Sequence, residues 1–260
     1  MTQTATNTPV DALWELYERR DFDELLRQIG PIGDLLADDG MPTEHTAPQL
    51  ELLGLILHER GQVSEATDTI EKAGLVVSLR DKSLIALASG YAERGKIDNA
   101  REMYLQLALS NRLPSEMMLE VAARLEAIDA PYLAMQVCEW ITERDAEFAQ
   151  AYYDMGCYSA RVGNALHLTE ALTQHALQLE PDNVNYRVGL ASLMIQLDRD
   201  EEAVEALRSV TNEQIAVVKC RSCLGRIAAL MRRHDHAERA DACDDRIAAL
   251  ESRAVKTVAA

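Results

Sequence analysis

The chain has 260 residues, of which 48% are hydrophobic and only 5% are aromatic, and this composition favours packed helices over a strand-rich sandwich. Its formal net charge of −17 argues against non-specific nucleic-acid binding, because phosphate affinity depends on Lys and Arg. No apolar run reaches the roughly 18 residues of a membrane span, and Met1 to Val10 lacks a signal-peptide pattern. These features predict a soluble, cytoplasmic protein without a membrane partner.

The first segment, LWELYERRDFDELLRQIGPIGDLL, has two stretches of helical spacing around a charged turn. Trp14 and Leu16 fall on the expected first helix, and Asp21 to Leu25 begin the second. The turn-forming stretch ADDGMPTEHTAP follows. We predict a degenerate helical hairpin plus loop over residues 1–46, which either packs on the rest of the chain or hinges relative to it.

From residue 47 onward, two series of small residues recur at a nearly constant step. The first advances by 34, 34, 34, 35 and 34 residues and consists of Gly54, Ala88, Ala122, Gly156, Ala191 and Gly225. The second follows 12 or 13 residues later and consists of Ala66, Ala100, Ala134, Thr169, Ala203 and Ala237. A repeat of this length is typical of a solenoid of stacked units. We predict a repeat array over 47–251 with units 47–80, 81–114, 115–148, 149–183, 184–217 and 218–251, then a frayed tail over 252–260.

Within each unit the apolar spacing predicts two helices joined by a short turn. In the first regular unit it runs from Leu50 to Leu57, stops at Arg60-Gly61, and resumes from Ala66 to Ala73. Small residues at fixed places fit such a hairpin, because Gly or Ala lets two helix backbones approach closely where they cross.

This pattern resembles the tetratricopeptide-repeat family, in which Leu-Gly, Tyr, Ala and Pro recur at similar places. Tyr152, Met155, Gly156 and Pro181 carry the resemblance most fully, whereas no Trp occupies the leading position of any unit. The resemblance implies an all-α fold, a right-handed αα-hairpin superhelix of about six to seven repeats. It also implies a concave groove lined by the first helix of each unit.

In this family, side chains three before and one, four and five after the small residue point into the groove. Carried over to this sequence, these positions are Glu51, Leu55, His58, Glu59, Ile85, Ser89, Glu93, Leu119, Glu126, Tyr153, Cys157, Arg161, Val188, Ser192, Ile195, Gln196 and Arg226. Ile85, Leu119, Tyr153 and Val188 share one equivalent position, which predicts an apolar contact stripe. The alternative is that some of them pack between neighbouring repeats. The Lys and Asn clamp with which some members bind chaperone tails is missing.

The sequence Cys220-Arg221-Ser222-Cys223, followed by His234 and His236, has residue types that bind zinc. We expect the two cysteines inside a first helix, where residues i and i+3 are simply neighbours, so we predict no metal and no cofactor. The odd number of cysteines, five, suits a reducing compartment.

The chain has no GxSxG, HExxH or Gly-rich phosphate loop, so no enzyme is predicted. The leading hypothesis is a non-enzymatic protein–protein interaction scaffold or adaptor that binds a peptide or helical segment in its groove. One alternative is a self-associating structural solenoid that forms homo-oligomers. The other is a pentatricopeptide-like RNA binder, which the acidic charge and the 34-residue step disfavour.

Overall fold

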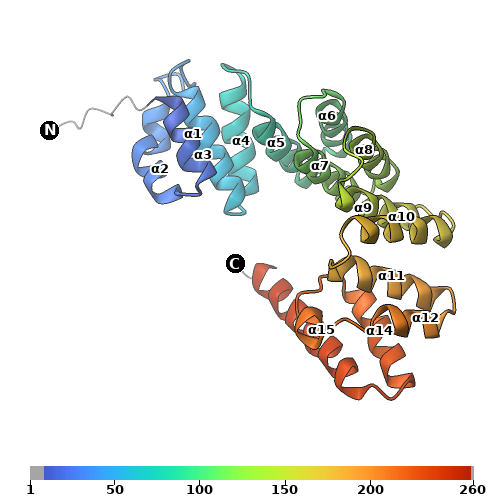
Figure 1. The fold of residues 1–260 in the computed structure, drawn as a ribbon. Coiled ribbons are helices and arrows are strands. Elements are labelled where there is room, and N and C mark those ends of the chain that lie inside the picture. Colours follow the sequence, from blue (N-terminus) through green and yellow to red (C-terminus); the bar gives the residue numbers. More distant parts are fainter. Residues whose placement is uncertain (1–8, 259–260) are drawn as a thin grey trace. The chain divides into compact units, whose positions relative to one another are not determined.

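The computed structural model describes residues 9–258, and the side chains of residues 9–252 (Figure 1). All of its regular elements in this range are helices, apart from one isolated bridge between Leu36 and Pro42. The chain divides into two compact units, one ending at Met117 and the other beginning at Met118. The all-α hairpin class predicted from the sequence is confirmed.

The first unit contains six α-helices and one 3-10 helix in its described part. They are α1 (Val10–Glu18), α2 (Phe22–Ile29), η1 (Ile32–Leu35), α3 (Ala47–Glu59), α4 (Val63–Gly74), α5 (Asp81–Glu93) and α6 (Ile97–Leu109). Next comes α7 (Ser115–Ala127), which spans the division between the units. The second unit continues with α8 (Pro131–Arg144), α9 (Ala149–Arg161), α10 (Leu166–Leu179), α11 (Val184–Gln196), α12 (Asp200–Ala206), α13 (Asn212–Ile215), α14 (Arg221–Arg233) and α15 (Ala237–Val258).

A single residue in the left-handed conformation closes each hairpin turn. Glycine supplies it at Gly61, Gly95 and Gly163, where φ is 77°, 74° and 84°. Glycine has no Cβ to clash in this region of backbone space, so it ends a helix without strain. The equivalent residues of the other turns are Arg20, Asp129, Asp198 and Asp235.

These turn residues correct the register predicted for the last unit. From Gly61 to Asp235 they advance by 34, 34, 34, 35 and 37 residues. The small residue at the crossing of α14 and α15 is therefore Ala228, which is 1% exposed, rather than the exposed Gly225. The added residues lie between α12 and α14, where Thr211 starts the extra helix α13 with a capping box.

Close helix approach explains several of the small residues. A Cβ on Gly54 would lie 2.5 Å from the Ile70 side chain of α4, and one on Gly90 would overlap the Thr67 hydroxyl and lie 2.9 Å from Thr67 Cβ. A Cβ on Gly225 would meet nothing within 4 Å. Glycine is thus required by packing in the first unit but not at position 225.

The N-terminal hairpin packs on the first regular hairpin of its unit. Leu13 and Trp14 of α1 belong to the same buried cluster as Leu52 and Leu55 of α3. The Arg80 guanidinium also lies 4.1 Å from the centre of the Trp14 ring, a cation–π contact. Of the two possibilities left open by the sequence, packing is the one observed.

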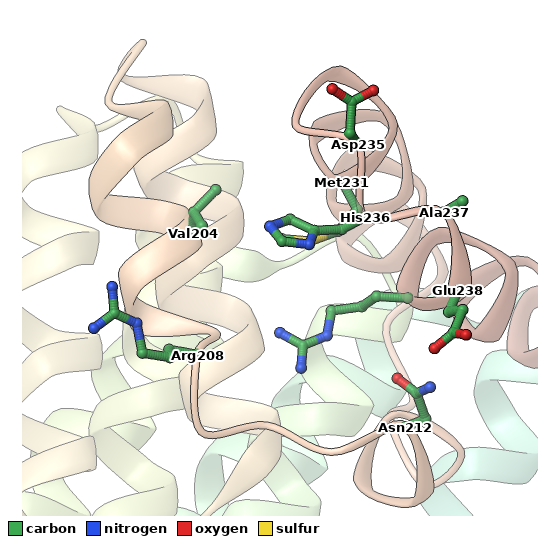
Figure 2. Close-up of a pocket in the computed structure, with 9 residues that line it drawn as sticks. Val204, Arg208, Asn212, Met231, Asp235, His236, Ala237 and Glu238 are labelled. Atoms are coloured by element: carbon green, nitrogen blue, oxygen red, sulfur yellow. The ribbon is translucent and has the colours of Figure 1, made fainter.

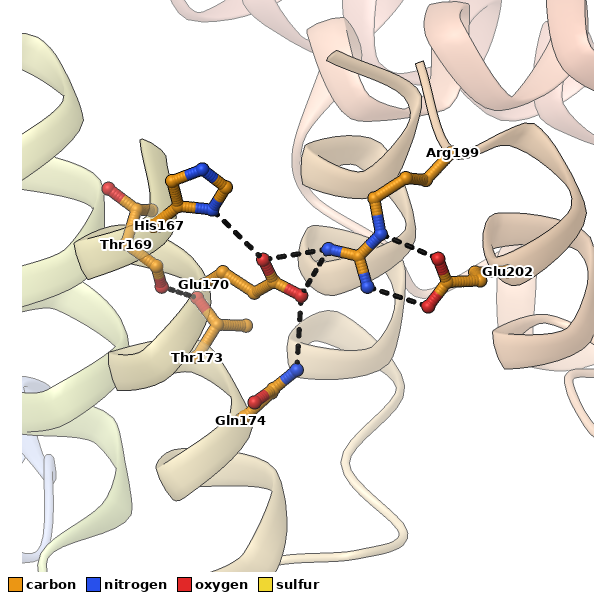
Figure 3. A network of polar contacts seen from close by, with 7 residues as sticks. All are labelled: His167, Thr169, Glu170, Thr173, Gln174, Arg199 and Glu202. Atoms are coloured by element: carbon orange, nitrogen blue, oxygen red, sulfur yellow. Dashed lines mark hydrogen bonds and ion pairs between the residues drawn. The ribbon is translucent and has the colours of Figure 1, made fainter. Parts of the chain in front are cut away.

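A polar network joins two consecutive hairpins of the second unit (Figure 3). Glu170 of α10 is 8% exposed and accepts hydrogen bonds from Arg199 at 2.7 and 2.9 Å. The same guanidinium donates to Glu202 of α12 at 2.6 Å. A buried carboxylate is tolerated here because Arg199 presents several donors in a fixed geometry.

Helix α15 continues through Val258, whereas the sequence predicted fraying from 252. Its last segment has neither Gly nor Pro to end a helix. Positions 259 and 260 lie outside the described residues. Across the described part of the chain, no helix is long and apolar enough to cross a membrane.

Candidate functional site

Most of the groove residues predicted in the first unit are used in its own packing. Glu51 is 3% exposed and accepts the Arg80 backbone N–H at 2.7 Å, which satisfies an amide at the start of α5. Leu55 and Ile85 are each 3% exposed. These three side chains therefore offer no surface to a partner, and the apolar stripe is not exposed at Ile85.

Of four more groove residues predicted in this unit, one is buried and three are at least partly exposed. Ser89 is buried and shares a hydrogen bond of 2.9 Å with the Tyr104 hydroxyl. Glu59 pairs with Arg20 at 2.9 Å, His58 is half-buried, and Glu93 is exposed.

In the second unit, the predicted residues at helix ends are engaged locally. Arg161 pairs with Glu126 and, at 3.1 Å, with Asp129. Gln196 donates to the Ser192 carbonyl at 3.1 Å. These polar contacts link or cap neighbouring helices.

The apolar positions of this unit divide between core and surface. Val188 is 1% exposed and lies in the buried cluster of the last hairpins, with the half-buried Ile195 packed against it. Leu119 and Tyr153 remain half-buried. The apolar stripe predicted from the sequence is thus interrupted at Val188. This side chain packs between neighbouring hairpins, which is the alternative that the sequence left open.

Tyr153 lies against the next first helix, α11. Its ring centre is 4.8 Å from that of Tyr186, and a Cβ on Gly189 would lie only 2.6 Å from its hydroxyl oxygen. Gly189 therefore makes room for the Tyr153 ring. The contact fixes the ring between two helices while part of it stays accessible.

Polar side chains extend this contact from α11 to α14. Arg226 Nη1 donates to Ser192 Oγ at 3.0 Å, and Cys223 is hydrogen-bonded to the same serine. On α9, Cys157 is hydrogen-bonded to Tyr153. We use the name α9–α14 cluster for six residues: Tyr153, Asp154, Cys157, Ser192, Cys223 and Arg226.

Two ionisable groups of the cluster have pKa values raised by desolvation. Cys157 is exposed, yet loss of solvation raises the pKa of its thiol to about 12. Desolvation likewise raises the pKa of the half-buried Asp154 from 3.8 to about 6. The hydrogen bond that Gln150 donates to its carboxylate lowers this pKa, but by less. Both shifts favour the neutral form of the group, because desolvation disfavours the charged form.

Of the two cysteines of the CxxC sequence, Cys223 lies inside α14 as predicted, whereas Cys220 lies just before it. Cys220 is the N-cap residue of α14, and its Sγ accepts the Cys223 backbone N–H at 3.3 Å. His234 and His236 follow the opposite end of this 13-residue helix, about 20 Å away at 1.5 Å per residue. The helix therefore separates the candidate metal ligands, and no group of three such ligands occurs among the residues with described side chains.

A cavity lies elsewhere in the second unit, beside the short helix α12 (Figure 2). Its volume is about 720 Å³, and Arg208, His236 and Glu238 are among its lining residues. Arg239, which also lines it, donates to the carbonyls of Leu207 and Val210 at 2.9 and 2.7 Å. The Arg239 charge thus serves to hold the chain after α12.

Sequence reasoning missed Asp154, Tyr186 and Cys223 as members or neighbours of the cluster. The side chain of Tyr186 is 1% exposed and supports Tyr153 from below the surface. Gly189, a glycine inside a helix, was the available signal, because such a residue often marks a close approach.

No family model and no curated protein sequence matches the chain. Among solved structures, a tetratricopeptide repeat protein from Parabacteroides merdae matches 93% of this chain and 91% of its own length, at 16% identity and a TM-score of 0.61. The protein pilF of Pseudomonas aeruginosa matches 76% of this chain and 88% of its own, at 15% identity and a TM-score of 0.58.

MamA from Desulfovibrio magneticus RS-1, from its residue 41 to its end, matches 63% of this chain and 92% of its own. The identity is 20% and the TM-score 0.53. Likeness at these identities concerns the fold, and it agrees with the helical hairpins and repeat spacing described above. The chain therefore has the tetratricopeptide-repeat fold that its sequence pattern predicts.

Proposed function

We propose that this chain is a non-enzymatic scaffold or adaptor that binds a peptide or helical segment of a protein partner. The α9–α14 cluster is the proposed contact surface. The observation that supports it is a chain of side-chain contacts across three successive first helices, in which Tyr153 of α9 packs on Tyr186 of α11 and Arg226 of α14 donates to Ser192 of α11. Stacked helical hairpins commonly use the surface of their first helices in this way.

Tyr153 has the properties of an anchor residue in this proposal. Its ring is held by Tyr186 and Gly189, so little side-chain entropy is lost when a partner covers it. Tyrosine combines a large apolar surface with one polar group, and such residues often contribute most of the binding free energy of an interface. Arg226, already held by Ser192, favours a partner segment with an acidic residue beside an apolar one.

A peptide-display selection against the immobilised protein tests this function. We expect wild type to enrich peptides that combine apolar and acidic residues, and Tyr153→Ala to weaken their binding at least about tenfold. Tyr132→Ala is the matched control, because Tyr132 is 58% exposed on α8, a second helix. Circular dichroism checks that each variant is folded.

Equal peptide binding by Tyr153→Ala and Tyr132→Ala would contradict the assignment of this surface. Light scattering of the same proteins addresses the self-association alternative. If the mass rises with concentration in wild type and does not rise in Tyr153→Ala, the surface binds a second copy of the chain.

A further inference from the structure

Two cysteines meet at the first turn of α14. Cys220 has the extended backbone of an N-cap residue, and its Sγ accepts the Cys223 backbone N–H at 3.3 Å. The Ser222 hydroxyl lies 3.3 Å from the same sulfur. Backbone N–H groups at a helix start favour negative charge on an atom placed there. Cys220 is therefore held in a position that stabilises its thiolate.

The groups around the pair come from three helices. Arg226 of α14 favours the thiolate form of both cysteines, and Ser192 of α11 is hydrogen-bonded to Cys223. Cys157 and Tyr153 of α9 interact electrostatically with the pair. Within the pair, the Cys223 backbone N–H donates to Cys220 Sγ, so the two residues are in direct contact.

These contacts shift the pKa values of the two thiols in opposite directions. The hydrogen-bonding interaction with the Cys223 side chain is the main cause that lowers the pKa of Cys220, and burial opposes it. The pKa of Cys223 is raised, first because its proton serves that hydrogen bond and then by desolvation. The contacts thus favour the thiolate on Cys220 and the thiol on Cys223, which is the arrangement of an attacking and a resolving thiol.

Access distinguishes this pair from the buried thiols. Cys220 and Cys223 are both partly exposed, whereas Cys138 and Cys243 are buried and belong to the hydrophobic core. A reagent can therefore reach the pair in the folded protein.

We propose that Cys220 and Cys223 form a thiol–disulfide exchange site that takes an external disulfide as its substrate. The Cys220 thiolate attacks one sulfur of that disulfide, so a mixed disulfide forms on Cys220 and one thiolate leaves. Cys223 then loses its proton to solvent and attacks Cys220 Sγ, which releases the second thiolate. The pair is oxidised by two electrons and the external disulfide is reduced to two thiols. This site does not depend on the proposed binding function.

The test uses the full chain, reduced and then exposed to oxidised glutathione at pH 7. After alkylation with iodoacetamide, peptide mass mapping identifies which cysteines are linked. We expect an internal Cys220–Cys223 disulfide in wild type and in Cys157→Ser. A linkage of Cys157 to Cys220 or Cys223, or no disulfide formation, would overturn the proposal.

Two variants assign the roles within the pair. Cys223→Ser should accumulate glutathione on Cys220, because the resolving thiol is gone. Cys220→Ser should leave Cys223 reduced and open to alkylation. Serine is itself a good N-cap residue, so this variant keeps the helix start and its circular dichroism should match wild type. Glutathione on Cys223 in Cys220→Ser, at the wild-type rate, would contradict the assigned order of attack.

The rate of alkylation gives a readout that no folding defect imitates. At pH 6 we expect Cys220 of wild type to react at least about tenfold faster than the exposed Cys157. Equal rates would refute a stabilised thiolate at Cys220.

A second arm replaces oxidised glutathione with a disulfide-linked peptide. Reaction with both probes, or with either one, supports the site, and the preferred probe tells whether the natural substrate is a small molecule or a protein disulfide. Failure with both refutes it. Because no binding partner is used, this result is separate from that of the peptide selection.

Discussion

Asp154 is the acidic member of the α9–α14 cluster, and its environment gives a pH-dependent stability. Burial raises its pKa from 3.8 to about 6, so the folded protein binds a proton that the unfolded chain has already released between these values. Stability contributed by the protonated form is present below pH 4 and is lost as pH rises to about 6. The charged carboxylate therefore costs stability at neutral pH.

Asp154→Asn should remove this cost while keeping the amide contact with Gln150, whose Nε2 lies 2.8 Å from the carboxylate. We expect the variant to be more stable than wild type at pH 7 by on the order of 1 kcal/mol, after allowance for solvent screening, and equally stable below pH 4. Urea unfolding across this pH range measures the difference. Asp241→Asn, at an exposed position of α15, is the control, and parallel pH profiles for wild type and Asp154→Asn would be evidence against the raised pKa.

Repeat spacing was enough to predict several residues of the cluster. Tyr153, Cys157 and Ser192 follow from the register of α9 and α11, which the structure retains. Arg226 was derived from Gly225, three residues from the true crossing at Ala228, and its long side chain nevertheless reaches Ser192. The burial of Val188 could not be predicted, because it depends on how neighbouring hairpins pack rather than on position within one repeat.

At the scale of single helices, two glycines inside helices have different roles. Gly90 of α5 faces Thr67 of α4 at a distance that no side chain fits, while Gly225 of α14 faces open space. Both lie within helices, where alanine is otherwise favoured over glycine by roughly 1 kcal/mol.

Gly90→Ala should therefore lower the free energy of unfolding by about 1–3 kcal/mol, since the α4–α5 contact must open. Gly225→Ala should leave it unchanged or raise it by up to about 1 kcal/mol. Thermal and urea unfolding of the two variants measure this difference in sign. Equal destabilisation by both would show that the α4–α5 approach is less tight than described.

The sequence predicted the existence and pairing of the helices better than it predicted the register of the last repeat unit. Its two series of small residues located five crossings, but an exposed Gly225 and Ala237 continued the 34-residue step by coincidence. The buried pair Ala228 and Ala240 marks the true sixth crossing. Helix α13 adds the residues that break the 34-residue step. A four-residue helix is too short to show a periodic apolar pattern in the sequence.

At the scale of the chain, two compact units each have a buried cluster of their own. Leu13, Leu50 and Ile70 belong to that of the first, and Leu207, Leu224 and Met231 to one in the second. In repeat proteins most stabilising contacts join neighbouring repeats, so a stretch of several hairpins can fold without the rest.

Fragments 1–114 and 115–260, cut in the loop between α6 and α7, should each be helical and unfold cooperatively in urea. We expect a sigmoidal transition for each, because each keeps the local contacts of its own hairpins. Circular dichroism during urea titration measures this. A fragment without a cooperative transition would mean that its core depends on the other part of the chain.

Several arginines near the C-terminus form ion pairs with acidic residues of the second unit. Arg221 pairs with Glu251 at 2.5 Å and Arg233 with Asp200 at 2.6 Å. Arg232 pairs with Asp244. These arginines link helices of the last hairpins, so their charges are engaged within the second unit.

The left-handed turn residues also bear on how such a chain can be recombined. Gly61 and Gly95 have φ values within a few degrees of each other and lie 34 residues apart. A gene segment copied or deleted between two such codons would rejoin backbone of the same local conformation at an exposed turn. The turns are therefore the natural junctions at which this chain can gain or lose a hairpin, in evolution or by design.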